Sequence, residues 1–213
     1  MITLCIAVAR RDYGWQGLCI DGSFSLALKV LQTRTCHVVQ AVVANRSGAE
    51  VRFATDDDFF RSGYGKIVGE KGQRSTGNIN RQTTTRLVDI LDHFKAPSTI
   101  DYLSLDVEGA EEAVLDGFKF ERYSFRALTV ERPKPRLRNT LRRRGYLYVG
   151  DHGCFGDQMW VHESMAEQAE RTLQLKNLRQ HGLFDSGAHD WFANCTPTKD
   201  RILRPAALVT RQG

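Results

Sequence analysis

The sequence predicts an α/β domain in which a mostly parallel sheet carries helices on both faces and an antiparallel hairpin at its C-terminal edge. Short apolar runs alternate with segments of helical periodicity, as in chains whose parallel strands are joined by helices. Two β-rich runs, 146–149 and 158–162, flank a turn around Asp151, which is typical of a hairpin. The 213 residues, 41% of them apolar, suffice for one such domain and an appendage.

The first half of the chain predicts strands, helices and one long loop. The run 17–21 is apolar and ends in an acid, as buried parallel strands often do. The segment 56–82 is polar and rich in glycine, which predicts a loop that lies over a site. In chain order we expect a strand at 17–21, a helix at 25–32, a strand at 36–43, a half-exposed strand at 50–54, the loop, and a threonine-capped helix at 83–94.

The second half repeats the alternation and then closes the sheet. Residues 1–165 are expected to form the domain, and 166–213 a C-terminal helix with an irregular tail. In chain order we expect a strand at 100–105, a helix at 111–118, a strand at 127–131, a basic helix at 137–144, the two hairpin strands, and a polar helix at 164–180.

The cysteines and the hydropathy pattern limit the class of protein. Five cysteines lie far apart without a CxxC motif, so neither a disulfide framework nor a zinc site is expected, and no other metal site is predicted. Free thiols favour a reducing, cytoplasmic compartment. No run of 18 apolar residues occurs, so no membrane-spanning segment is predicted.

Acidic residues stand at the predicted carboxyl ends of three strands, where open α/β sheets bind ligands. These are Asp21, Asp106 and Glu131, and Glu108 joins them from the turn after Asp106. Asp21 can accept hydrogen bonds from a ribose diol, or serve as an ordinary turn acid. Asp106 and Glu108 can contact a substrate hydroxyl, an ammonium group or a metal ion, or cap a helix and form a salt bridge. His152 offers either a catalytic base or a loop-stabilising hydrogen bond.

The segment 132–144, RPKPRLRNTLRRR, is rich in Lys and Arg and has no acid. Such a patch can bind nucleic acid or an anionic substrate, but it is also typical of a solvated helix face. No aromatic residue is interleaved for base stacking, so nucleic acid is not the expected partner.

The stretch IDYLSLDVEGAE at 100–111 resembles the signature of FkbM-type methyltransferases, which use S-adenosylmethionine. The blocks GWQGLCID (14–21), RSGYGKIVG (61–69) and GDQMWVH (156–162) resemble flanking parts of that family. The resemblance implies a class I methyltransferase-like, Rossmann-like fold and O-methyl transfer to a sugar or small-molecule hydroxyl. It implies catalytic roles for Asp106, Glu108 and Glu131, and cofactor contacts from Asp21, Gly22, Ala41, Val42 and Asp106.

One part of the family pattern is missing, namely the first strand and its glycine-rich D-[IV]-G-A-N-x-G loop. Residues 2–8 cannot replace that strand in parallel, because only about eight residues follow before Gly17 and a parallel crossover needs about a dozen. We therefore expect an N-terminally incomplete domain with weak cofactor binding. A non-catalytic interaction module on the same fold stays open as the alternative, and the sequence predicts no oligomeric state.

Overall fold

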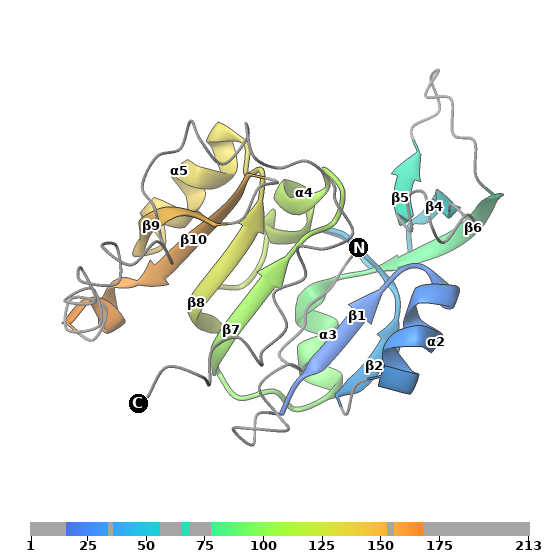
Figure 1. Ribbon diagram of the computed structural model, residues 1–213, viewed down its shortest axis with the longest axis horizontal. Coiled ribbons are helices and arrows are strands. Elements are labelled where there is room, and N and C mark those ends of the chain that lie inside the picture. The colour runs from blue at the N-terminus through green and yellow to red at the C-terminus, as the bar shows by residue number, and fades with distance from the viewer. Residues whose placement is uncertain (1–15, 34–35, 56–64, 69–77, 153–155, 168–213) are drawn as a thin grey trace, which may run out of the picture.

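The computed structural model describes residues 16–33, 36–55, 65–68, 78–152 and 156–167. These residues form a mixed α/β structure with three sheets and four α-helices (Figure 1). The strands are β1 (Leu18–Asp21), β2 (His37–Gln40), β3 (Val42–Val43), β4 (Glu50–Thr55), β5 (Gly65–Val68), β6 (Asn78–Thr85), β7 (Thr99–Leu105), β8 (Ser124–Glu131), β9 (Tyr146–His152) and β10 (Asp157–His162). The helices are α2 (Phe24–Thr33), α3 (Leu87–His93), α4 (Glu111–Leu115), α5 (Pro135–Arg143) and the 3₁₀ turn η1 (Glu163–Met165).

Two parallel strand pairs and the hairpin agree with the sequence prediction. β1 pairs with β2 in parallel, and β7 pairs with β8 in parallel. The predicted hairpin is confirmed, because β10 runs antiparallel to both β8 and β9 in the sheet order β7-β8-β10-β9. α2 packs on β1 and β2, while α5 packs on β9 and α4 (Figure 1).

The expected α/β class is confirmed, but a single mostly parallel sheet is not, because the described residues form several sheets. The third sheet, in the order β3-β6-β4-β5, is largely antiparallel. The run 36–43, predicted as one strand, therefore forms two, because β2 pairs with β1 whereas β3 pairs with β6. Part of the predicted loop forms β5 and β6. β6 has mostly exposed side chains and little apolar content, so its sequence, NINRQTTT, carries no buried-strand pattern.

Two helix predictions also need correction, and a third lies mostly outside the described residues. Thr83 belongs to β6, and α3 begins only after Arg86, which makes no side-chain cap. β-branched threonines pack well in a strand, and here they continue the pairing of β6 with β4 and β3. α4 ends at Leu115 rather than at residue 118. The predicted helix at 164–180 starts as η1, and residues 168–213 lie outside the described part of the chain.

One hydrophobic core joins the two parallel pairs. Ile20 of β1 belongs to the same buried cluster as Leu103 and Leu105 of β7 and Leu128 of β8. Trp160 of β10 closes this core with no exposed surface. The strand ends that carry the predicted acids are thus anchored in a common interior. No helix within the described ranges is long and apolar enough to cross a membrane.

The prediction of free thiols is wrong for two of the five cysteines. Cys19 of β1 and Cys36, which precedes β2, form a disulfide with their Cα atoms 6.2 Å apart. Parallel pairing of the two strands brings these buried residues together, although they are 17 positions apart in sequence. The other three cysteines lie outside the described residues.

Removing this disulfide should lower the stability of the fold. The bond closes a loop across 17 positions, and a loop of this size is worth about 3 kcal/mol through the restricted unfolded chain. We expect the Cys19→Ala/Cys36→Ala variant to lose about that much free energy of unfolding in urea. A reductant should lower the free energy of unfolding of the wild type to about that of the variant and leave that of the variant unchanged. Two alkylatable thiols from these positions in the native, unreduced protein would contradict the assignment.

Candidate active site

The turn after β1 holds a buried carboxylate that is only half satisfied. Asp21 is 4% exposed, and its Oδ1 atom accepts a 2.7 Å hydrogen bond from the backbone N–H of Ser23. Its Oδ2 atom is buried and has no hydrogen-bond partner among the described residues. Burial raises the pKa of Asp21 to about 6, although the Ser23 amide opposes the shift. An unsatisfied buried acceptor is costly, so a hydroxyl donor from a ligand would relieve it.

The next residue, Gly22, is fixed by two glutamine side chains. The Nε2 atoms of Gln40 and Gln82 donate to the carbonyl oxygen of Gly22 at 3.1 and 3.0 Å. A Cβ atom at Gly22 would lie 2.6 Å from Cζ of Phe53 and 3.1 Å from Cγ2 of Val42. Close packing therefore requires glycine here, and the β1 turn is tied to β6 through Gln82.

The structure brings the predicted cofactor residues of this region together. The N–H of Ala41 donates to the carbonyl oxygen of Asp21 at 3.0 Å, which extends the β1–β2 pairing. Ala41 is half-buried, whereas Val42 is only 1% exposed and packs against Gly22. Asp21 and Ala41 thus lie side by side, while the Val42 side chain is occupied in packing.

A second cluster forms where β7 and β8 end. Their parallel register pairs Leu105 with Val130, so the following residues, Asp106 and Glu131, lie side by side. One carboxylate oxygen from each of Asp106, Glu108 and Glu131 lies within 4.8 Å of the others. The predicted catalytic acids are therefore together. Their oxygens are close enough to hold one divalent cation, but acidic groups at this spacing are common without one.

The turn that carries Glu108 has a constrained backbone. Glu108 has φ +54° and Gly109 has φ +93°, in the left-handed region that residues other than glycine rarely adopt. The buried Glu111 stabilises this turn, because its Oε1 atom accepts from the backbone N–H groups of Val107 at 3.1 Å and Gly109 at 2.9 Å. The sequence did not predict this role of Glu111, because an acid in the first turn of a helix is common for the helix dipole alone.

Arg132 also lies at the cluster, although from its sequence it was expected only to be part of the basic segment 132–144. It forms an ion pair with Glu131, whose side chain is 8% exposed. Arg132 has φ +40°, and its N–H donates to the carbonyl oxygen of Gly156 at 3.1 Å. A Cβ atom at Gly156 would lie 3.0 Å from Cγ of Arg132, so the residue before β10 packs closely against the arginine. The only sequence signal was an arginine directly after a strand-end acid.

The cluster carries a proton near neutral pH. Burial raises the pKa of Asp106 to about 7, with further contributions from a hydrogen bond to Glu131 and from the charges of Glu131 and Glu108. The Arg132 guanidinium forms an ion pair with Glu131. Asp106 can therefore accept or release a proton at the pH where an acid–base catalyst is most useful.

Asp21 and the acid cluster lie at the carboxyl ends of their strands. In Figure 1 the arrows of β1 and β7 point the same way, and Ile20 and Leu105 belong to one core cluster. Asp21 is the last residue of β1 and Asp106 directly follows β7, so both lie at carboxyl strand ends, where α/β sheets bind ligands. The side chain of His152, the other candidate base, lies outside the described residues.

The comparisons with known proteins give one finding. A family model described as the methyltransferase FkbM domain matches residues 4–148. No curated protein and no solved structure matches the chain.

Proposed function

Because the chain belongs to the methyltransferase FkbM domain family, we propose that it transfers a methyl group from S-adenosylmethionine to a hydroxyl of a sugar or another small molecule. The observation that carries this proposal is the acid cluster at the ends of β7 and β8. It holds a carboxyl group, Asp106, whose pKa is raised to about 7, beside Glu131, which forms an ion pair with Arg132. Methyl transfer to a hydroxyl needs such a proton acceptor.

The β1 turn suits the nucleoside part of the cofactor. Bound S-adenosylmethionine would supply a methyl group on a sulfonium, which an incoming oxygen attacks in line. The Oδ2 atom of Asp21 is a buried acceptor without a partner in the described part of the chain, and a ribose hydroxyl would supply a donor. Ala41, whose N–H donates to the carbonyl oxygen of Asp21, is the residue that we expect to contact the base.

The acid cluster suits the acceptor. Asp106 in its ionised form takes the proton from the acceptor hydroxyl as the new O–C bond forms. Glu131, held by Arg132, and Glu108, held by its turn, orient that hydroxyl. Positioning of this kind accounts for much of the rate when two reactants must meet in line.

A transfer assay tests the activity itself. The protein is incubated with S-adenosylmethionine labelled in the methyl group and with a panel of simple glycosides and polyols. We expect label in at least one acceptor, in step with release of S-adenosylhomocysteine, and loss of that label in Glu108→Gln. Label that appears equally with heat-denatured protein, or in no acceptor, would count against catalysis.

One structural observation favours a second candidate, a non-catalytic interaction module on the same fold. Among the described residues β1 pairs only with β2, and β7 only with β8, so no described strand joins the two pairs. If the module reading holds, the chain binds neither S-adenosylmethionine nor S-adenosylhomocysteine at millimolar concentration.

Gln82 should influence cofactor affinity without touching the reacting atoms. Its Nε2 atom fixes the carbonyl oxygen of Gly22 and so the orientation of the neighbouring Asp21. We expect Gln82→Ala to weaken S-adenosylmethionine binding by about 3- to 10-fold, the worth of one hydrogen bond. The matched control is Arg81→Ala on the same strand, which removes only an exposed ion pair with Glu50. Equal effects of the two variants in calorimetry would show that the turn does not depend on Gln82.

A further inference from the structure

One edge of β1 offers backbone groups that no described strand pairs with. The N–H of Ala41 donates to the carbonyl oxygen of Asp21 at 3.0 Å, so the odd-numbered residues of β1 turn their backbone groups toward β2. Successive residues of a strand in a parallel pair direct these groups to opposite edges. The N–H and C=O groups of Leu18 and Ile20 therefore face away from β2, where β1 has no partner among the described residues.

β7 has a matching edge. The N–H of Ser124 donates to the carbonyl oxygen of Ser98, directly before β7, at 2.8 Å, so the even-numbered residues of β7 face β8. Leu103 and Leu105 turn their backbone groups to the other side, where no strand in the described part of the chain pairs with β7. Figure 1 shows the arrows of β1 and β7 pointing the same way, with no described strand between them.

These two edges belong to one core. Their residues, Leu18, Ile20, Leu103 and Leu105, are called the four edge residues below; all are buried, and all lie in the same hydrophobic cluster. Buried N–H and C=O groups are paired in folded proteins, because an unpaired one costs as much as a lost hydrogen bond. Strand edges that stay free are usually protected by charges or prolines, and neither occurs at 18–20 or 103–105. The two edges thus form a slot for one strand.

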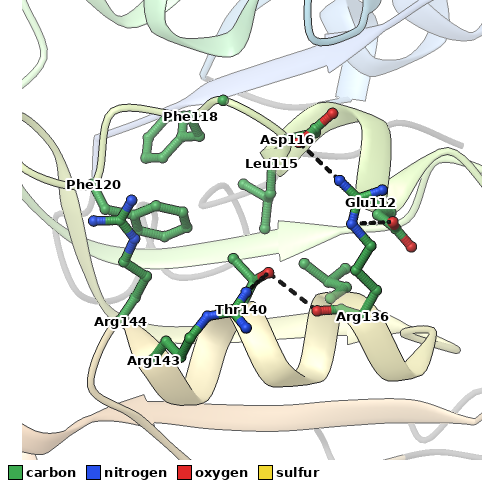
Figure 2. A pocket seen from close by; sticks show the side chains of 11 residues that line it. Glu112, Leu115, Asp116, Phe118, Phe120, Arg136, Thr140, Arg143 and Arg144 are labelled. Carbon is green, nitrogen blue, oxygen red and sulfur yellow. Dashed lines mark hydrogen bonds and ion pairs between the residues drawn. The ribbon is translucent and has the colours of Figure 1, made fainter.

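The surroundings of the slot are apolar beside β7. Leu115 of α4 and Leu137 of α5 belong to the same core cluster as Leu103. Figure 2 shows Leu115 pointing from α4 toward α5, and Arg136 ties α5 to Glu112 at 3.2 Å. β1 is buried along its whole length, as is typical of a strand inside a sheet rather than at its edge. A strand in the slot must therefore be apolar.

The run 2–8, ITLCIAV, has the composition that this slot requires. It carries no charge and is rich in the β-branched residues that favour strands. Eight residues separate it from Gly17. They are too few for a parallel crossover but enough for an antiparallel return, which can be as short as about two residues. Residues 1–15 lie outside the described part of the chain.

The charge at the N-terminus indicates the direction of this run. Burial raises the pKa of Asp21 to about 6 and that of Asp106 to about 7, and the positive charge of the N-terminus opposes the rise at both residues. Both acids stand at the carboxyl ends of their strands, whereas the chain enters β1 at its amino end. A segment that starts near the acids and leads to the amino end of β1 runs antiparallel to β1 and β7.

We propose that residues 2–8 insert as an antiparallel strand between β1 and β7. One edge of the inserted strand pairs with Leu18 and Ile20, and the other edge pairs with Leu103 and Leu105. The sheet then continues from β2 to β9, and its interior backbone groups are paired. This pairing does not depend on methyl transfer, because it concerns the backbone of the protein without any ligand.

Nuclear magnetic resonance of the full-length wild type tests the insertion. Opposed residues of antiparallel strands bring their Cα atoms to about 4.5 Å in the pairs without hydrogen bonds, so their α-protons give cross-strand contacts. We expect such contacts from residues 2–8 to β1 and also to β7, at every protein concentration. Contacts to neither strand or to only one would overturn the proposal. Contacts that disappear on dilution, as a dimer dissociates, would also overturn it, because a second copy would then fill the slot.

Amide hydrogen exchange with a matched pair of variants gives a second test. Proline has no N–H and does not fit an interior strand, so Ile6→Pro should speed exchange at the four edge residues at least about tenfold. The control, Arg10→Pro, lies after the run and should leave these amides within about twofold of the wild type. Equal acceleration in both variants, or fast exchange at these amides already in the wild type, would contradict the insertion. The α-proton contacts of the wild type decide the question even if Ile6→Pro folds poorly.

Discussion

Asp106→Asn should reduce methyl transfer by about 10²- to 10⁴-fold, the usual contribution of a general base. The asparagine keeps the size of the side chain but cannot take a proton from the acceptor. Because the pKa of Asp106 is raised to about 7 by burial and by Glu131, the wild-type rate should rise with pH through this value as Asp106 ionises. The measurement is kcat against pH for both proteins. The residual activity of the variant should not follow that rise.

The control for Asp106→Asn is Glu112→Gln, which changes an acid of the same region that pairs with Arg136 instead. Its kcat should stay within about twofold of the wild type, since a surface ion pair is worth little. If Asp106→Asn left kcat unchanged and altered only the apparent affinity for the acceptor, Asp106 would bind the hydroxyl without receiving its proton.

Asp21→Asn should stabilise the fold at high pH and weaken the binding of the cofactor. The folded pKa of Asp21, about 6, lies above the ordinary 3.8, so the folded state favours the protonated, neutral carboxyl. The stability that this proton gives is complete below about pH 4 and is lost as the pH rises through 6. Asparagine stays neutral throughout. The variant should therefore gain up to about 2 to 3 kcal/mol over the wild type at pH 8, since one pKa unit corresponds to about 1.4 kcal/mol, and nothing at pH 4.

Urea unfolding at pH 4 and pH 8 measures this difference. Asp101→Asn is the control, because Asp101 is an exposed acid with a weak surface contact to Arg126. That variant should show no pH-dependent gain. A gain in stability of equal size at both pH values would mean that burial does not raise the pKa of Asp21. A residue that costs stability and is nevertheless placed at a ligand-binding strand end fits a binding role.

The predictable part of this molecule is the part encoded by local pattern. The apolar run that ends at Asp21, the strand at 100–105 and the hairpin arms were predictable because each element shows its own periodicity and ending. The grouping of Asp106, Glu108 and Glu131 followed from one rule, that parallel strands end at one edge. The roles assigned to these residues stay predictions.

The missed features depend on contacts between distant segments. β6 is a strand because β3 and β4 pair with it, and its own sequence is polar. The Cys19–Cys36 disulfide follows from the pairing of β1 with β2, and the spacing of the cysteines does not predict that pairing. Arg132 reaches Glu131 because Gly156 of a distant turn packs over it. The hydrogen bond from Gln82 to the carbonyl oxygen of Gly22 joins residues 60 positions apart.

Calorimetric titration with S-adenosylmethionine tests the central claim most directly, because Asp21 and the acid cluster form a methyl-transfer site only if the cofactor binds at the β1 turn. The account predicts one saturable site in the wild type and an affinity at least about tenfold lower in Asp21→Asn, which removes a charged acceptor. Asp101→Asn should bind as the wild type does. The absence of binding at millimolar ligand, or equal binding by the wild type and Asp21→Asn, would contradict the account.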